Sequence, residues 1–206
     1  MRPRIEILAV GLLCSLLVLP GPHAQTKHQK TQLPLYEDRD GYEVLSVLLN
    51  TGIDIWKNET VRIHPLTPSG KYLAEIKAQC SVIPAEFQTA SEDFDKQIRT
   101  RFLLRQRFSL KKTYQLAAPV AASPPTDEDK ALSKAEFGRL IRERIRSGTY
   151  YVAAVGFDDK RTRAVAFVEY ICGNLCGDSM FYFLRKSEKG WEEARDVKVT
   201  DCGRIY

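Results

Sequence analysis

The residues best placed to do chemistry in this 206-residue chain are its cysteines. Cys172 and Cys176 frame the segment Cys-Gly-Asn-Leu-Cys-Gly between two runs with the character of strands. Four cysteines follow the N-terminal segment, and an even number in an exported chain favours disulfides, with three connectivities open. We favour a Cys172–Cys176 bridge that pins a hairpin tip. Cys80 and Cys202 would then tie the C-terminal tail to the middle of the chain.

Two other chemical roles are alternatives for the same cysteines. A thiol oxidoreductase acting through Cys172 and Cys176 would normally use Cys-x-x-Cys before a helix, whereas here three residues intervene and no such helix is expected. A four-cysteine zinc site has the right ligand number but an irregular spacing. We therefore predict no metal and no cofactor. The turn serves either stability alone or recognition, and its candidate contact residues are Gly173, Asn174, Leu175 and Gly177.

One histidine is the remaining candidate for catalysis. His64 ends a short strand candidate beside Pro65, whereas His28 lies in a polar lead-in. A secreted hydrolase using His64 with a carboxylate is the enzymatic alternative. The chain holds no HExxH, GxSxG, Walker or GxGxxG motif. We therefore expect a non-catalytic protein that binds a protein, a glycan or a small ligand.

The N-terminus predicts export. Arg2 and Arg4 precede an unbroken apolar run, Ile7–Leu19, which ends at a Pro-Gly-Pro segment. We expect a signal peptide at 1–24 and a secreted or periplasmic mature protein. An uncleaved anchor and a lipoprotein modified at Cys14 are the alternatives. The apolar run is shorter than the roughly 20 residues that span a bilayer, so no stable span is expected after processing.

The charge balance is mildly basic, with 31 basic and 26 acidic residues and a net charge of +5. Basic residues cluster at 99–112 and 139–146. Such clusters are either solvated helix faces or contacts for an anionic polymer or lipid head group. No aromatic-interleaved nucleic-acid motif accompanies these clusters, so we expect an extracytoplasmic protein or anionic polymer as partner and no nucleic acid. Asn58 begins a glycosylation acceptor, which matters only in a eukaryotic secretory pathway.

The rest of the chain is organised as one domain. Residues 25–36 are expected to be a flexible lead-in, 37–206 a single domain, and 117–131 an exposed low-complexity loop rich in Ala, Pro and acid. Helical spacing of apolar residues predicts a helix over 40–50 and another over 84–98. Ser133 and Glu136 form a capping box, which predicts a third helix that ends near Gly148.

Short strands dominate the remainder. A short strand is predicted at Val61–Ile63 and another at 108–116, where apolar and polar residues alternate. Short turns join the four candidates after the third helix, and short connections force antiparallel neighbours. We therefore predict an α+β fold, with helices packed on one face of an antiparallel β-meander of about four strands. These four strands are Tyr150–Phe157, Arg163–Ile171, Met180–Lys186 and Trp191–Val199.

The C-terminal third resembles a group of uncharacterised exported bacterial proteins. The matching residues are Val155-Gly156-Phe157, the run from Ala164 to Val168, the Cys-Gly-Asn-Leu-Cys-Gly segment, Phe181-Tyr182-Phe183 and Trp191. The resemblance carries over no activity and no catalytic residue. Members of that group end near a Trp-Ile-Ser-like strand, so Cys202 and its expected partner Cys80 look like an addition in this chain.

Overall fold

The computed structural model describes residues 32–58, 60–80, 82–118, 133–173, 176–197 and 202–205. The chain divides into Met1–Gln32 and Leu33–Tyr206, and every element below belongs to the second unit. The segments expected to be a signal peptide and a low-complexity loop lie largely outside the described residues. Tyr36, at the end of the expected lead-in, is buried, and its backbone N–H donates to the Leu103 carbonyl at 2.9 Å.

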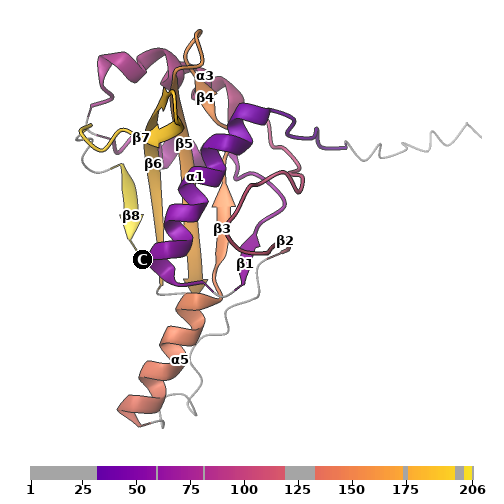
Figure 1. Ribbon diagram of the computed structural model, residues 1–206, viewed down its shortest axis with the longest axis vertical. Helices are drawn as coiled ribbons and strands as arrows, with labels where there is room; N and C mark the ends of the chain where they lie inside the picture. The colour runs from indigo at the N-terminus through magenta and orange to yellow at the C-terminus, as the bar shows by residue number, and fades with distance from the viewer. Residues whose placement is uncertain are drawn as a thin grey trace, which may run out of the picture. The chain divides into compact units, whose positions relative to one another are not determined.

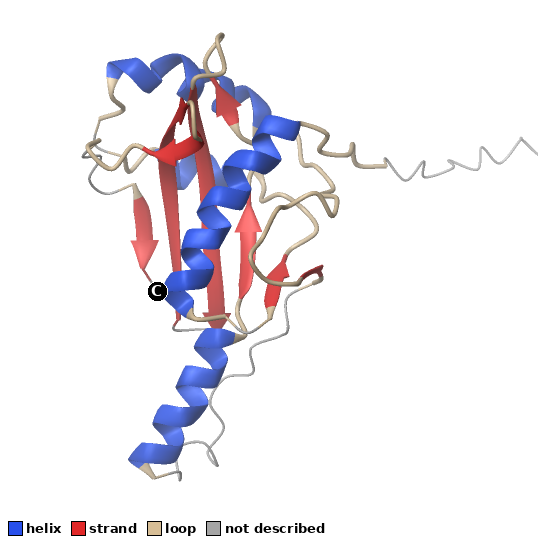
Figure 2. Cartoon of the chain, in the orientation of Figure 1, coloured by secondary structure: helices blue, strands red, loops and turns tan. Residues whose placement is uncertain are grey.

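The described strands form one mixed sheet of eight strands (Figures 1 and 2). Its main path runs β2-β1-β3-β5-β6-β7, while β4 pairs with β5 and β8 pairs with β6. The strands are β1 (Val61–Ile63), β2 (Tyr114–Leu116), β3 (Thr149–Val152), β4 (Gly156–Phe157), β5 (Arg163–Gly173), β6 (Cys176–Ser187), β7 (Gly190–Glu193) and β8 (Gly203–Ile205).

The predicted α+β class holds, but the predicted four-stranded antiparallel meander is too simple. The antiparallel ribbon β3-β5-β6-β7 is present. However, β1 runs parallel to both β2 and β3, which makes the sheet mixed. The strand predicted at Tyr150–Phe157 is interrupted between β3 and β4, where the Val155 N–H donates to the Tyr36 hydroxyl instead of a neighbouring strand.

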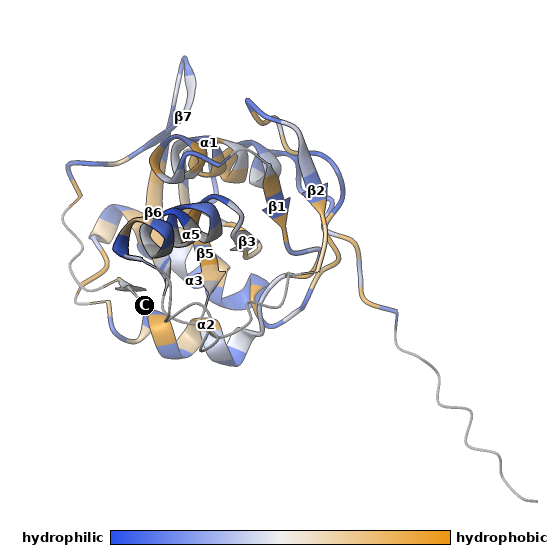
Figure 3. Ribbon diagram, turned by 90° about the horizontal axis from the view of Figure 1, so that it is seen from below, coloured by the Kyte–Doolittle hydropathy of each residue, from blue (hydrophilic) through white to orange (hydrophobic). Residues whose placement is uncertain are grey.

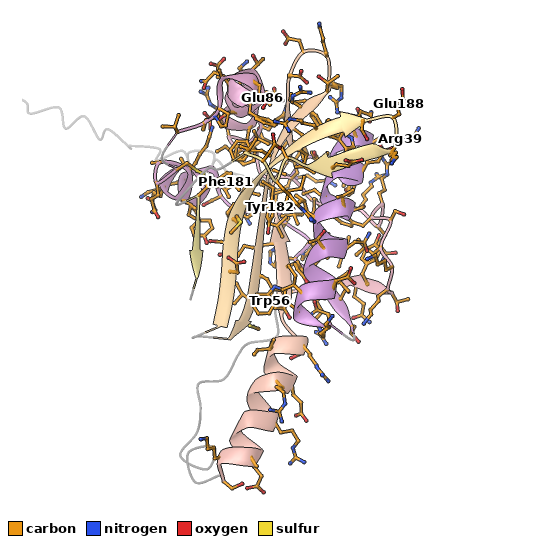
Figure 4. All side chains as sticks on the ribbon, turned by 60° about the vertical axis from the view of Figure 1, so that its left-hand side comes forward. Arg39, Trp56, Glu86, Phe181, Tyr182 and Glu188 are labelled. Atoms are coloured by element: carbon orange, nitrogen blue, oxygen red, sulfur yellow. A yellow bond between two sulfur atoms is a disulfide. The ribbon has the colours of Figure 1, made fainter. Side chains whose placement is uncertain are left out.

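Helices cover both faces of the sheet, not one face as the sequence predicted. Helix α1 (Arg39–Trp56) covers one face, and α2 (Gly70–Lys77) with α3 (Gln88–Gln97) covers the other (Figure 3). Alternate residues of a strand point to opposite faces. Phe181 therefore packs under α3 while its neighbour Tyr182 packs toward α1 (Figure 4).

Two apolar cores result, separated by the sheet. The α1 core takes the even-numbered residues of β5, from Ala164 to Cys172, and the α2–α3 core takes Val165 and Phe167. Strand β4 lies directly against α3: a Cβ at Gly156 would stand 2.2 Å from the Phe94 nitrogen and 2.4 Å from the Ala90 carbonyl oxygen. Only glycine permits this approach.

Local capping explains where the helices begin. The carboxylate of Asp38 accepts from the Gly41 N–H at 3.1 Å and caps α1, which continues to Trp56, beyond its predicted end, because Ile53 is buried. Ser133 and Glu136 form the predicted capping box of α5 (Lys134–Arg146), with the Ser133 N–H donating to Glu136 at 3.0 Å. A short 3-10 helix, Ala85–Phe87, leads into α3. None of the described helices is long and apolar enough to cross a bilayer.

Candidate binding groove

An open groove of about 750 Å³ lies between helices α2 and α3. Small and apolar residues, Ala74, Ala78 and Ile98, line it together with a few charged side chains. Binding sites for small molecules typically have volumes of about 300–1,000 Å³ and combine an apolar lining with a small number of polar groups. The groove therefore has the size and lining of a site for a small ligand.

A close backbone contact brings two cations to the groove. Gly70 begins α2 next to Ile98, and a Cβ at this position would lie 2.4 Å from the Ile98 carbonyl oxygen. Lys71 follows Gly70 and Arg99 follows Ile98, so the contact holds both residues at the same end of the groove. Both side chains are exposed, and neither has an ion-pair or hydrogen-bond partner among the described residues.

A third cation is held inside the groove. The side chain of Lys77 is only 11% exposed, and its Nζ lies 2.6 Å from Asp95 Oδ1 and 3.0 Å from the Ser91 carbonyl oxygen. The ammonium also lies 5.7 Å from the centre of the Phe94 ring. These contacts satisfy Lys77 and neutralise Asp95, and the pair links α2 to α3.

The electrostatics of the groove follow from these contacts. Lysine and arginine contribute three positive charges to its lining, and Asp95 contributes the single negative charge. Because Asp95 is taken up by Lys77, the charges of Lys71 and Arg99 remain uncompensated. A site with two uncompensated cations beside an apolar floor favours a ligand that carries negative charge.

One predicted disulfide follows α2, the helix on one side of this groove. Cys80 follows α2 and is bonded to Cys202, with an S–S distance of 2.02 Å. The Cys202 carbonyl accepts from the Phe181 N–H at 2.9 Å, so the bridge connects the end of α2 to the sheet. The predicted pairing of Cys80 with Cys202 is therefore what the structure contains.

The predicted hairpin tip is described only in part. Cys172 is buried and disulfide-bonded. The side chain of Cys176 and the residues Asn174 and Leu175 lie outside the described part, so the Cys172–Cys176 bridge and a recognition role for the turn stay predictions. The backbones of Gly173 and Cys176 pair across the hairpin, and Gly177 is buried opposite Ile171.

His64 is held by an aromatic ring and by the backbone of Leu66. Its ring stacks on Tyr151, with centroids 4.9 Å apart and an interplanar angle of 18°. Its Nδ1 lies 2.9 Å from the Leu66 carbonyl oxygen and 3.2 Å from the Leu66 nitrogen. Throughout the described ranges no aspartate or glutamate hydrogen-bonds to this ring, so the structure does not assemble the histidine–carboxylate pair of the enzymatic alternative.

Asn58 serves the fold from a fully buried position. Its amide accepts from the Tyr150 hydroxyl at 2.7 Å and donates to the Tyr170 hydroxyl at 2.7 Å and to the Arg146 carbonyl at 3.0 Å. With 0% exposure, this side chain cannot accept a glycan in the folded protein. The acceptor pattern at Asn58 therefore reflects packing.

Much of the first basic cluster is paired within the protein. Arg105 and Arg107 both contact Glu37, at 3.4 and 2.8 Å, and Lys111 contacts Asp54 at 2.5 Å. Arg99 differs from them because it faces the groove without an acidic partner. In the described part of the chain, no group of three or more His, Cys, Asp or Glu is placed to hold a metal ion.

Sequence reasoning missed the groove because its residues come from two separate helices. Lys71 and Arg99 are 28 positions apart, and only the Gly70–Ile98 contact places them together. No protein-family model, curated protein or solved structure matches the chain. The groove is therefore the feature of the molecule that points to a function.

Proposed function

We propose that the protein is an exported, non-catalytic binding protein that holds a small anionic ligand in the groove between α2 and α3. The observation that carries this proposal is the pair Lys71 and Arg99, fixed at one end of the groove and uncompensated by acid. An internal disulfide is compatible with export, because such bonds persist in oxidising compartments.

The groove could orient a ligand as well as attract it. Lys71 and Arg99 would bind the carboxylate or phosphate group of the ligand, and the arginine can do so with two parallel hydrogen bonds. Ala74, Ala78 and Ile98 offer an apolar surface for the rest of the molecule. The Lys77–Asp95 pair would then set the far limit of the site without contributing net charge.

Isothermal titration calorimetry on the oxidised protein tests the proposal. Galacturonate and citrate supply carboxylates, glycerol phosphate supplies a phosphate, and galactose is the uncharged match to galacturonate. We expect at least one anion to bind and galactose not to bind. The variant K71Q/R99Q should weaken that binding at least about tenfold, since two charge-assisted hydrogen bonds are lost.

A matched variant separates the effect of the groove residues on binding from the effect of net charge. K160Q/K189Q removes two exposed lysines from turns outside the groove and should leave the affinity unchanged. Equal loss in both double variants, or no binding of any anion at millimolar concentration, would refute the proposed site. Circular dichroism on each variant checks that the fold is retained.

A further inference from the structure

A second cavity lies where the C-terminal end of α5 meets the sheet (Figure 1). Its volume is about 450 Å³, and no residue lines both this pocket and the groove between α2 and α3. The lining comes from β1 and the residues just before it, and from the end of α5 and the residue after it: Thr60, Arg62, Glu143, Arg146 and Ser147. Charged groups of both signs are present, so this pocket favours a different ligand from the groove.

The fold directs Arg62 into this pocket. Its neighbours Val61 and Ile63 are fully buried in the α1 core, so Arg62 lies on the opposite face of the sheet. Strand β1 runs parallel to β3, and Arg62 lies level with Thr149, the first residue of β3. Since a short connection joins α5 to β3, this register brings Arg62 to the end of the helix.

Hydrogen bonds to the rest of the fold hold the other side of the pocket. The Arg146 carbonyl accepts from the buried Asn58 amide at 3.0 Å, and the Ile145 carbonyl accepts from the Tyr170 hydroxyl. These bonds fix the last turn of α5 against β5 and against the segment before β1. Glu143 lies three positions before Arg146 and therefore on the same face of the helix. Both sides of the pocket are thus fixed to one sheet.

Two opposite charges in this pocket are unpaired. Arg62 is half-buried and Glu143 is exposed, and neither makes an ion pair or a hydrogen bond in the described part of the chain. A charged group that is withdrawn from water without a partner destabilises a fold. Because Arg62 and Glu143 line one cavity without pairing with each other, a molecule that carries both an acidic and a basic group would complete both of them.

We propose that this pocket binds a free amino acid. The guanidinium of Arg62 would bind the α-carboxylate through two parallel hydrogen bonds, and the carboxylate of Glu143 would bind the α-ammonium. The volume of the pocket lies within the range of about 300–1,000 Å³ that is typical of sites for small ligands. A simple anion would leave Glu143 unpaired and a simple amine would leave Arg62 unpaired, so both should bind more weakly.

Thermal-shift screening of the common amino acids at millimolar concentration, followed by calorimetry, tests this inference. We expect at least one amino acid to bind. Its analogue without the amino group and its analogue without the carboxylate should each bind at least about tenfold more weakly, since each lacks one charge-assisted contact. Arg62→Gln and Glu143→Gln should each weaken binding of the amino acid by a similar factor, and circular dichroism checks that each variant is folded.

The specificity of Glu143→Gln separates a direct contact from a structural role. In this variant the amino acid should bind no better than its analogue without the amino group, because the ammonium has lost its partner. Glu188→Gln removes an exposed carboxylate from the turn between β6 and β7, far from α5, and should leave the affinity unchanged (Figure 4).

The groove variant K71Q/R99Q should also retain amino-acid binding, so this pocket and the anion groove can fail separately. No binding of any common amino acid at millimolar concentration would overturn the proposal. Equal affinities of the parent protein for the amino acid and its two analogues, or equal losses in Glu143→Gln and Glu188→Gln, would overturn it as well.

Discussion

The guanidinium of Arg161 binds the carboxylate of Asp38 through both oxygens, at 2.6 and 2.8 Å. Its Nε also donates to Asp40 at 2.7 Å, and the group lies 3.9 Å from the centre of the Phe157 ring. These contacts fasten the β4–β5 turn to the first turn of α1. They hold Arg161 at a φ of 53°, a backbone conformation that strains residues other than glycine.

This arrangement predicts different effects for two substitutions of the same residue. Arg161→Ala loses the ion pairs and keeps the backbone strain, so unfolding free energy should fall by roughly 1–2 kcal/mol after allowance for solvent screening. Arg161→Gly loses the same contacts but relieves the strain, and should be less destabilising by about 1 kcal/mol. Urea denaturation measures both. If Arg161→Gly is no more stable than Arg161→Ala, the backbone at position 161 is not strained.

The buried amide of Asn58 predicts a large loss of stability on truncation. Asn58→Ala removes the partner of the Tyr150 hydroxyl and of the Arg146 carbonyl in the interior, and one of the donors to the Tyr170 hydroxyl, which should cost roughly 2–4 kcal/mol. Asn50→Ala is the matched control, because the Asn50 amide also makes several hydrogen bonds, to the backbone of Ser109 and Lys111, but from a partly exposed site. Equal melting temperatures for the two variants would contradict the large contribution assigned to the Asn58 hydrogen bonds.

Asp178, a half-buried aspartate on β6, should make the stability of the fold depend on pH. Burial raises the pKa of Asp178, and its Oδ1 has no hydrogen-bond partner among the described residues. Because the folded protein holds this proton more tightly than the unfolded chain, the contribution of Asp178 to stability is present at acid pH and is lost as pH rises through its folded pKa.

Asp178→Asn should therefore raise the melting temperature at pH 7 by roughly 2–4 °C. The difference should shrink as the pH falls from neutral through the raised pKa of Asp178 in the folded protein, and it should level off below about 4, where the unfolded carboxyl is also protonated. Melting curves of both proteins between acid and neutral pH provide the measurement. An asparagine variant that is less stable than the parent at neutral pH would show that the carboxylate has a partner in solution.

The disulfide between Cys80 and Cys202 should stabilise the fold substantially, because it closes a separation of 122 residues. Such bridges typically contribute about 2–4 kcal/mol. The variant C80S/C202S should melt lower by roughly 6–12 °C in non-reducing buffer. A melting temperature equal to that of the parent would mean that the bridge does not form in the purified protein.

Features set by neighbouring residues could be predicted from the sequence. The capping box of Ser133 and Glu136 acts across three positions, and α5 begins where it indicates. Helix α2 was missed because Leu73 and Ile76 alone give it an apolar face, shortly after Pro65 and Pro68. The parallel pairing of β1 with β2 and β3 joins distant segments, and no local pattern encodes it.

The residue pattern of β5 carries a further indication of the fold. Strand β5 is apolar at Val165 and Phe167 as well as at Ala164, Ala166 and Val168, and such a run indicates a strand covered on both faces. That pattern predicts helices on both sides of the sheet, as the structure has them. The groove could not be found in this way, because the approach of Gly70 to Ile98 is a property of the packed backbone.

The most direct test of anion binding by the groove is to measure the affinity of the parent and of two variants for the same anion by calorimetry. Asp95→Asn removes the one acidic group of the groove and frees Lys77, so it should bind several-fold more tightly than the parent. K71Q/R99Q should bind at least about tenfold more weakly. This order of affinities is the predicted result, and equal affinities in the three folded proteins would contradict anion binding by the groove.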